Sequence, residues 1–233
     1  MLLFSHIFFT KEFYIFAETM SNYIDIHTHA VPDAATTTSI ISHRLGMEAP
    51  PRCRYFSAGI HPWDAEILHP TLSQQLKQLE MIDCVAFGEI GLDKACDADF
   101  EIQREIFERQ TQLAATRDLP VIIHCVRSLN EVVEILSRNS ISRAIFHGFI
   151  GSPEQASQIT AHRWHISFGF NALRSPKTLR ALRHIPLEAL FLENDTSQRR
   201  IEELYEIVCK TRNIEIEELK NIINNNFHRF FEL

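Results

Sequence analysis

The sequence is notable first for what it lacks. Its five cysteines are scattered without a CxxC pair, a pattern typical of reduced thiols in a cytoplasmic protein rather than of a disulfide framework. No apolar run reaches the roughly 18 residues that a membrane-spanning helix needs. There is no Gly/Ser-rich or Pro-rich linker and no low-complexity tract, and no obligate protein partner is evident. These absences predict one globular domain with no membrane association.

An excess of positive charge is also missing. The 233 residues carry a formal net charge of −7, so the basic footprint of a domain that binds nucleic acid over its whole surface is absent. This argues against tight non-specific DNA binding. It leaves a nuclease possible, because a metal site can hold phosphate locally.

Residues 1–19 look like an extension rather than part of the domain. They contain the short apolar run LLFSHIFF, which is interrupted by Lys11 and Glu12 and has no basic region before it, unlike a signal peptide. Met20 offers an alternative start just before the first predicted strand. We therefore expect residues 20–233 to form a single domain.

Apolar runs alternate with helical patterns along this domain. Eight runs are strand candidates, most of them apolar throughout, as in strands buried on both faces. They are 23–27, 38–42 (the weakest), 54–60, 84–90, 120–124, 144–147, 164–170 and 189–193. Helical patterns fall mainly at 99–117, 128–138, after Ser152-Pro153, after Ser175-Pro176, at 199–210 and from Glu215 onward.

This alternation predicts an α/β fold, a TIM-type (β/α) barrel. About thirty residues separate His29 from Gly59, which is too few for the helices and strand of a full barrel. The sector between the first and third strands should therefore be curtailed.

Histidine or acidic residues stand at the predicted C-terminal ends of five strands, the face where barrel active sites form. Each alone could be a surface or packing residue. His27 and His29 share one face of a strand because alternate side chains point the same way, and Glu89 follows an apolar run where an unpaired charge would be costly. Together the candidates indicate a metal site: His27, His29, Glu89, His124, His147 and Asp195.

This donor set suits Zn, Mn, Fe or Co better than Ca. Six ligands exceed what one tetrahedral zinc needs, so two metals are favoured. The remaining histidines lack a strand-end position, apart from one in a GIHP motif, and are interpreted as surface or packing residues: His6, His43, His69, His162, His165, His184 and His228.

Six separated motifs resemble those of the TatD family of metal-dependent hydrolases, in the same order, over about residues 22–233. They are HTH at 27–29, GIHP at 59–62, GEIGLD at 88–93, PVIIHC at 120–125, FHGFIGS at 146–152 and LENDTS at 192–197. The family has a β/α barrel, uses divalent metals and includes deoxyribonucleases. The resemblance thus implies one or two divalent ions (Zn, Mn or Mg) and DNA or another phosphodiester as substrate.

The resemblance also implies roles for individual residues. Glu89 matches the glutamate that bridges two metals, with His27, His29 and Asp195 on one ion and His124 and His147 on the other. The expected reaction is two-metal activation of water, with Asp195 orienting or deprotonating the water. On the substrate side, His61 matches the GxHP histidine, and Arg127 stands near the position of a family arginine.

The chain departs from the family pattern where substrate would be held. Asn194 replaces a threonine, the loop that normally follows Asp195 is missing, and Arg127 falls three rather than two residues after His124. The chain looks like a shortened member of the family. Two alternatives therefore stay open: a hydrolase of C–N or C–O bonds in a small molecule, and a non-catalytic remnant that binds metal.

Overall fold

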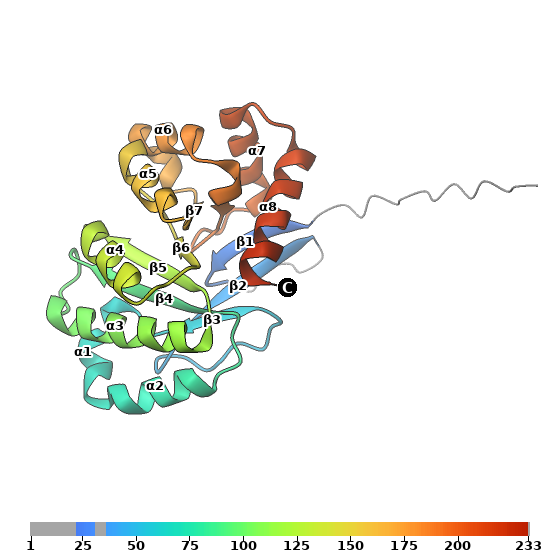
Figure 1. Cartoon of the computed structure of the whole chain (residues 1–233). Helices are drawn as coiled ribbons and strands as arrows, with labels where there is room; N and C mark the ends of the chain where they lie inside the picture. Colours follow the sequence, from blue (N-terminus) through green and yellow to red (C-terminus); the bar gives the residue numbers. More distant parts are fainter. Residues whose placement is uncertain (1–21, 31–35, 233) are drawn as a thin grey trace, which may run out of the picture.

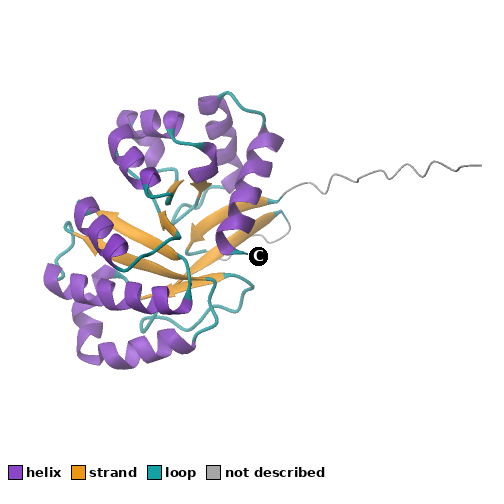
Figure 2. Cartoon of the chain, in the orientation of Figure 1, coloured by secondary structure: helices purple, strands orange, loops and turns teal. Residues whose placement is uncertain are grey.

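The computed structural model describes residues 22–30 and 36–232, and the expected extension at 1–19 lies outside them. Eight strands form one sheet in the order in which they occur along the chain, and every neighbouring pair is parallel. Helices surround this sheet (Figures 1 and 2). The strands are β1 Tyr23–Thr28, β2 Thr37–Arg44, β3 Phe56–Gly59, β4 Ala86–Asp93, β5 Val121–Val126, β6 Ala144–Phe146, β7 His165–Phe168 and β8 Leu190–Leu192. The fold is the expected TIM-type barrel.

The barrel closes between its first and last strands. Thr28 pairs with Asp195 in a parallel bridge just beyond β8. The amide of Asp195 donates to the carbonyl of His27 at 2.9 Å, and the amide of His29 donates to the carbonyl of Asp195 at 3.2 Å. The seam thus brings the HTH segment and Asp195 together through the backbone itself.

The sector between β1 and β3 is curtailed, as the sequence predicts. Only residues 29–36 separate β1 from β2, which is too short for a crossover helix. Residues 45–55, which join β2 to β3, contain no helix. The weakest strand candidate, 38–42, is a full strand that runs over Thr37–Arg44.

Helices follow each later strand. They are α1 Ala65–Leu68, α2 Leu72–Met81, α3 Phe100–Arg117, α4 Leu129–Arg138, α5 Pro153–Ala161, α6 Pro176–His184, α7 Ile201–Arg212 and α8 Ile216–Phe231, with 3₁₀ helices η1 Pro62–Asp64, η2 His69–Thr71, η3 Ala172–Arg174 and η4 Leu187–Ala189. The Asp99 side chain caps α3, and Ser152 caps α5 in a capping box with Gln155. No helix in the described part of the chain is long and apolar enough to cross a membrane.

The strand β4 differs most from its predicted bounds. The prediction ended at Ile90, whereas β4 continues to Asp93 and is buried along its whole length. Glu89 therefore sits within the strand rather than at its exit. Its side chain enters the barrel interior, where any charge must be compensated.

Candidate metal centre

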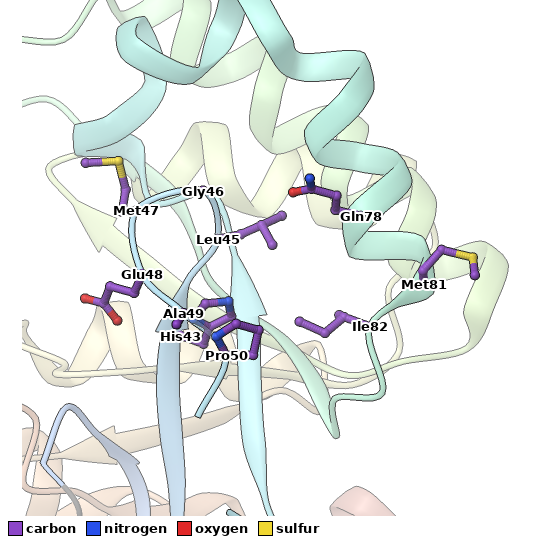
Figure 3. A pocket seen from close by; sticks show the side chains of 10 residues that line it. All are labelled: His43, Leu45, Gly46, Met47, Glu48, Ala49, Pro50, Gln78, Met81 and Ile82. Atoms are coloured by element: carbon purple, nitrogen blue, oxygen red, sulfur yellow. The ribbon is translucent and has the colours of Figure 1, made fainter. Parts of the chain in front are cut away.

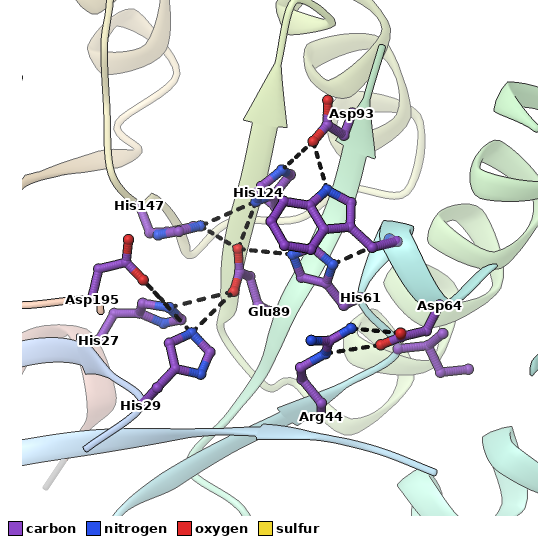
Figure 4. Close-up of polar contacts among 12 residues, drawn as sticks. His27, His29, Arg44, His61, Asp64, Glu89, Asp93, His124, His147 and Asp195 are labelled. Atoms are coloured by element: carbon purple, nitrogen blue, oxygen red, sulfur yellow. Dashed lines mark hydrogen bonds and ion pairs between the residues drawn. The ribbon is translucent and has the colours of Figure 1, made fainter. Parts of the chain in front are cut away.

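Glu89 is the centre of a cluster at the C-terminal mouth of the barrel (Figure 4). Its side chain is almost fully buried, and both carboxylate oxygens face histidines. The structure brings together all six residues that the sequence singled out as metal ligands, and adds His61. The two oxygens of Glu89 divide this cluster into two groups.

Oε2 of Glu89 faces the barrel seam. It lies 3.4 Å from Nε2 of His27 and 3.8 Å from Nε2 of His29. Oδ1 of Asp195 lies 3.6 Å from the same nitrogen of His29 and 4.0 Å from that of His27. Two imidazoles and two carboxylates thus surround one small volume.

Oε1 of Glu89 faces the other histidines. It lies 2.6 Å from Nδ1 of His124, 2.5 Å from Nε2 of His147 and 3.2 Å from Nε2 of His61. His124 lies within β5 and His147 directly follows the neighbouring strand β6, so the parallel register carries both to the same rim. Three imidazole rings thus gather around this oxygen, next to the group at Oε2.

Two further carboxylates hold these histidines from outside the cluster. Oδ2 of Asp93 lies 3.1 Å from Nε2 of His124, and Oε1 of Glu193 lies 3.4 Å from Nδ1 of His147. Glu193 is fully buried and also accepts a hydrogen bond from the Ser167 hydroxyl. A carboxylate that binds the outer N–H of an imidazole leaves the other ring nitrogen free to act as a ligand.

The outer ring nitrogen of His61 accepts a hydrogen bond, whereas those of His124 and His147 face carboxylates. The backbone N–H of Trp63 donates to Nδ1 of His61 at 3.1 Å, so the proton of the neutral ring must sit on Nε2. Nε2 then faces Glu89 as a donor and has no free lone pair for a metal. Although His61 lies close enough to join Glu89 and His124 around an ion, its hydrogen bonding fits a donor to substrate better than a ligand.

Helix α3 fixes the backbone beneath this site with two buried glutamines. The side chain of Gln110 accepts from the amide of Ile60 at 2.7 Å and donates to the carbonyl of the same residue at 3.1 Å. Gln103 makes the same pair of bonds to Asp93, at 2.8 and 3.1 Å. The backbones of Ile60, which precedes His61, and of Asp93, whose carboxylate faces His124, are thereby bound to the same helix.

Protons are shared unequally within the cluster. Burial opposes ionisation of Glu89, but the charge of His147 and hydrogen bonds from His124 and His147 outweigh it and hold the pKa of Glu89 well below its ordinary value. Burial likewise opposes protonation of His147, but the charges of Glu89 and Glu193 raise its pKa well above the ordinary value. Without metal, protonated imidazole therefore balances the central carboxylate.

The residues present fit a divalent metal. His27 is fully buried, yet neither of its ring nitrogens has a hydrogen-bond partner among the described residues. A buried imidazole without a partner is costly unless something else binds it. His27, His29 and Asp195 would hold an ion at Oε2 of Glu89, and His124 and His147 would hold one at Oε1.

Arg127 lies apart from the cluster. Its side chain is exposed and lines a cavity of about 420 Å³ that His147, Lys94 and Gln155 also border. A larger cavity of about 610 Å³ between residues 43–50 and α2 contains none of the cluster (Figure 3). His43 is buried at its edge and packs against Phe56, in agreement with a packing role.

Three residues near the site were not singled out from the sequence. Asp93 and Glu193 were visible as acids within the GEIGLD and LENDTS motifs, but their contacts with His124 and His147 require the fold. Trp63 follows the GIHP motif directly, and its indole N–H donates to Oδ2 of Asp93 at 2.7 Å. Its position beside a predicted site residue was the available signal.

A β/α barrel with a histidine–carboxylate cluster at its C-terminal mouth defines a class of metal-dependent enzymes. The family model for TatD related DNase matches residues 25–232. The metal-dependent hydrolase YjjV of Escherichia coli K12 is 30% identical over 199 residues, covering 77% of each chain. The chain belongs to the TatD family of metal-dependent hydrolases.

Other relatives extend this comparison. The crystal structure of the E. coli YjjV protein superposes with a TM-score of 0.75 at 25% identity, covering 92% of this chain and 99% of that one. The 3'-5' ssDNA/RNA exonuclease TatD of Pectobacterium carotovorum is 29% identical over 160 residues, covering 65% of this chain and 60% of its own. The family thus includes proteins named as nucleases and others named only as hydrolases.

Proposed function

We propose that this protein is a phosphodiesterase that uses two divalent metal ions, with Glu89 as the residue that would hold both. The observation that carries the proposal is the division of the cluster, in which each oxygen of one buried carboxylate faces a separate group of donors. The likeness to a family member named as a single-stranded nucleic-acid exonuclease supports a phosphodiester as the substrate.

Bound divalent ions supply an attacking water of lowered pKa and stabilise negative charge on the phosphoryl oxygens. Asp195 accepts the proton of the attacking water. In the metal-free protein, burial and then the charge of Glu193 raise the pKa of Asp195, so this carboxylate takes up a proton more readily than an ordinary one. Nε2–H of His61 donates to a phosphoryl oxygen, and Arg127 pairs with an anionic oxygen farther along the substrate.

The test starts from protein stripped of metal and reloaded with Mn, Mg or Zn. Turnover of bis-p-nitrophenyl phosphate and of a short single-stranded oligonucleotide is compared with turnover of p-nitrophenyl acetate. We expect metal-dependent cleavage of the phosphodiesters. Glu89→Gln should abolish it and lower the bound metal, whereas Glu105→Gln, which changes an exposed partner of His69, should leave both unchanged.

Two results would reject the proposal. Cleavage of the acetate ester alone would assign the site to carboxylic esters or related small molecules. Binding of metal without turnover of any of these substrates would indicate a non-catalytic protein. The early start of α7 at Ile201, which leaves only a short segment after Asp195, would then be the structural reason.

A further inference from the structure

Trp63 stands out among the aromatic residues. Its side chain is 54% exposed, whereas every other phenylalanine, tyrosine and tryptophan in the described part of the chain is buried or half-buried. It lies at the rim of the candidate metal centre, with ring centroids 4.7 Å from His61 and 5.9 Å from His124. Its position beside the candidate metal centre leaves an aromatic face open to a ligand held there.

The indole is held in place rather than free. Its N–H donates to Oδ2 of Asp93, the atom that also faces Nε2 of His124. Arg44 forms a two-pronged ion pair with Asp64, at 2.9 and 2.5 Å, and so anchors the short η1 helix that carries Trp63 (Figure 4). A ligand that stacks on this ring does not have to pay for ordering it.

The distance from the centre suits a nucleotide. One imidazole, His61 or His124, separates Trp63 from Oε1 of Glu89. In a nucleotide, one sugar separates the base from its phosphate. A phosphate held at the cluster therefore leaves the attached base within reach of the indole.

We propose that Trp63 is a platform on which a nucleobase next to the scissile phosphate stacks, so that the substrate class is a single-stranded nucleic acid or a nucleotide ester. This rests on the phosphodiesterase function proposed above. Stacking on an aromatic ring accepts any base, because every base has a π-face. Base edges need not be read for Trp63 to contribute.

The experiment compares three proteins loaded with Mg: wild type, Trp63→Phe and Trp63→Leu. Phenylalanine keeps an aromatic face but loses the N–H that binds Asp93, and leucine loses both. Binding of dTMP and of 2-deoxyribose 5-phosphate, which lacks the base, is measured by calorimetry. Tryptophan fluorescence provides a second readout, because the other tryptophan, Trp164, is buried and donates to the carbonyl of Ile141.

We expect wild type to bind dTMP more tightly than the sugar phosphate, with quenching of its fluorescence. Trp63→Leu should weaken dTMP binding by about 5- to 150-fold and leave the affinity for the sugar phosphate unchanged. Trp63→Phe should still bind dTMP more tightly than the sugar phosphate. Equal affinity of wild type for the two ligands, or an unchanged preference in Trp63→Leu, would overturn the platform.

A third result would assign a different role. If both variants lose metal affinity together with dTMP binding, Trp63 acts only by orienting Asp93 and His124, and the platform is rejected. Hydrolysis of the dinucleotide TpT, measured in parallel, separates this inference from the proposed function. If wild type hydrolyses TpT but binds dTMP and 2-deoxyribose 5-phosphate equally, the platform alone is rejected. If wild type binds dTMP more tightly than 2-deoxyribose 5-phosphate but does not hydrolyse TpT, the phosphodiesterase alone is rejected.

Discussion

The pKa values of the two carboxylates that face His27 and His29 are shifted in opposite directions. The pKa of Glu89 lies well below its ordinary value because histidines outweigh the effect of burial. The pKa of Asp195 is raised by burial and by Glu193, although His27 and His147 oppose this. Such divergence separates a permanently charged ligand from a group that can exchange a proton.

Replacing Asp195 with asparagine tests this separation. Asparagine is nearly isosteric and keeps an oxygen for metal, but it cannot accept a proton. We expect turnover of bis-p-nitrophenyl phosphate to fall by about 10²–10⁴-fold, while metal content, measured by elemental analysis, falls less. Retention of turnover within about threefold of wild type would show that Asp195 takes no part in proton transfer.

At the scale of elements, helix α7 clamps the first strand. The hydroxyl of Tyr205, a fully buried residue, accepts from the amide of Ile24 and donates to its carbonyl, both at 3.0 Å. Its ring also packs edge-on against Tyr23 at 5.0 Å. The clamp joins α7 to β1, a strand that is separated from β2 by only residues 29–36.

Tyr205→Phe removes the hydroxyl and leaves both backbone groups of Ile24 without this partner. We expect the free energy of unfolding to fall by about 1–3 kcal/mol, measured by urea denaturation. Tyr55→Phe is a matched control, since Tyr55 is half-buried and packs against Phe227 through its ring. If both variants lose the same free energy of unfolding, the hydrogen bonds between Tyr205 and Ile24 do not stabilise the fold.

The sequence predicted the eight strands and the helices from α3 onward because their signals are local, whereas α1 and α2 were not predicted. Apolar runs mark the strands, and Asp99 and Ser152 mark the helix starts that they cap. The end of β4 was predicted too early, because the polar residues of GEIGLD interrupt the apolar pattern that was used to find it. Glu89 and Asp93 nevertheless belong to a fully buried strand, compensated by histidines from elsewhere.

The site was only partly predictable, because local sequence signals place the ligands but do not show their distant partners. The convergence of the six candidate ligands follows from the parallel barrel, since five of them come at or near the C-terminal ends of strands and Glu89 projects from within β4. Which nitrogen of each imidazole faces inward depends on partners distant in sequence, such as Asp93 for His124 and Glu193 for His147. The acceptor role of Nδ1 in His61 depends on a backbone turn at Trp63 that no residue pattern specifies.

For the molecule as a whole, protons and the proposed metal ions would compete for the same histidines and carboxylates. The pKa of His147 is raised, so its contribution to metal-free stability is complete below the ordinary value of 6.5 and is lost as pH rises through the folded value. The pKa of Glu89 is lowered, so its contribution is complete above the ordinary value of 4.5 and is lost as pH falls through the folded value. Metal-free protein should therefore be most stable between these two ordinary values.

With metal present, stability should instead rise with pH above 6.5, because the ligands must be deprotonated to bind metal. We expect metal affinity to be higher at about pH 8 than at about pH 6, with protons released on binding. Calorimetry in buffers of different ionisation enthalpy measures both. Affinity that is independent of pH, with no proton release, would show that His124 and His147 are already neutral in the metal-free protein.

The closure of the barrel also sets the order in which the protein can be completed during synthesis. The bonds from Ile24 to Tyr205 and from Asn22 to Asn224 span 181 and 202 residues. Strand β1 leaves the ribosome well before its seam partner Asp195 and before helices α7 and α8, which contact it. Since contacts this distant in sequence form slowly, His27 and His29 wait for Asp195, which lies 167 residues beyond Thr28, before the donors at the barrel seam can gather.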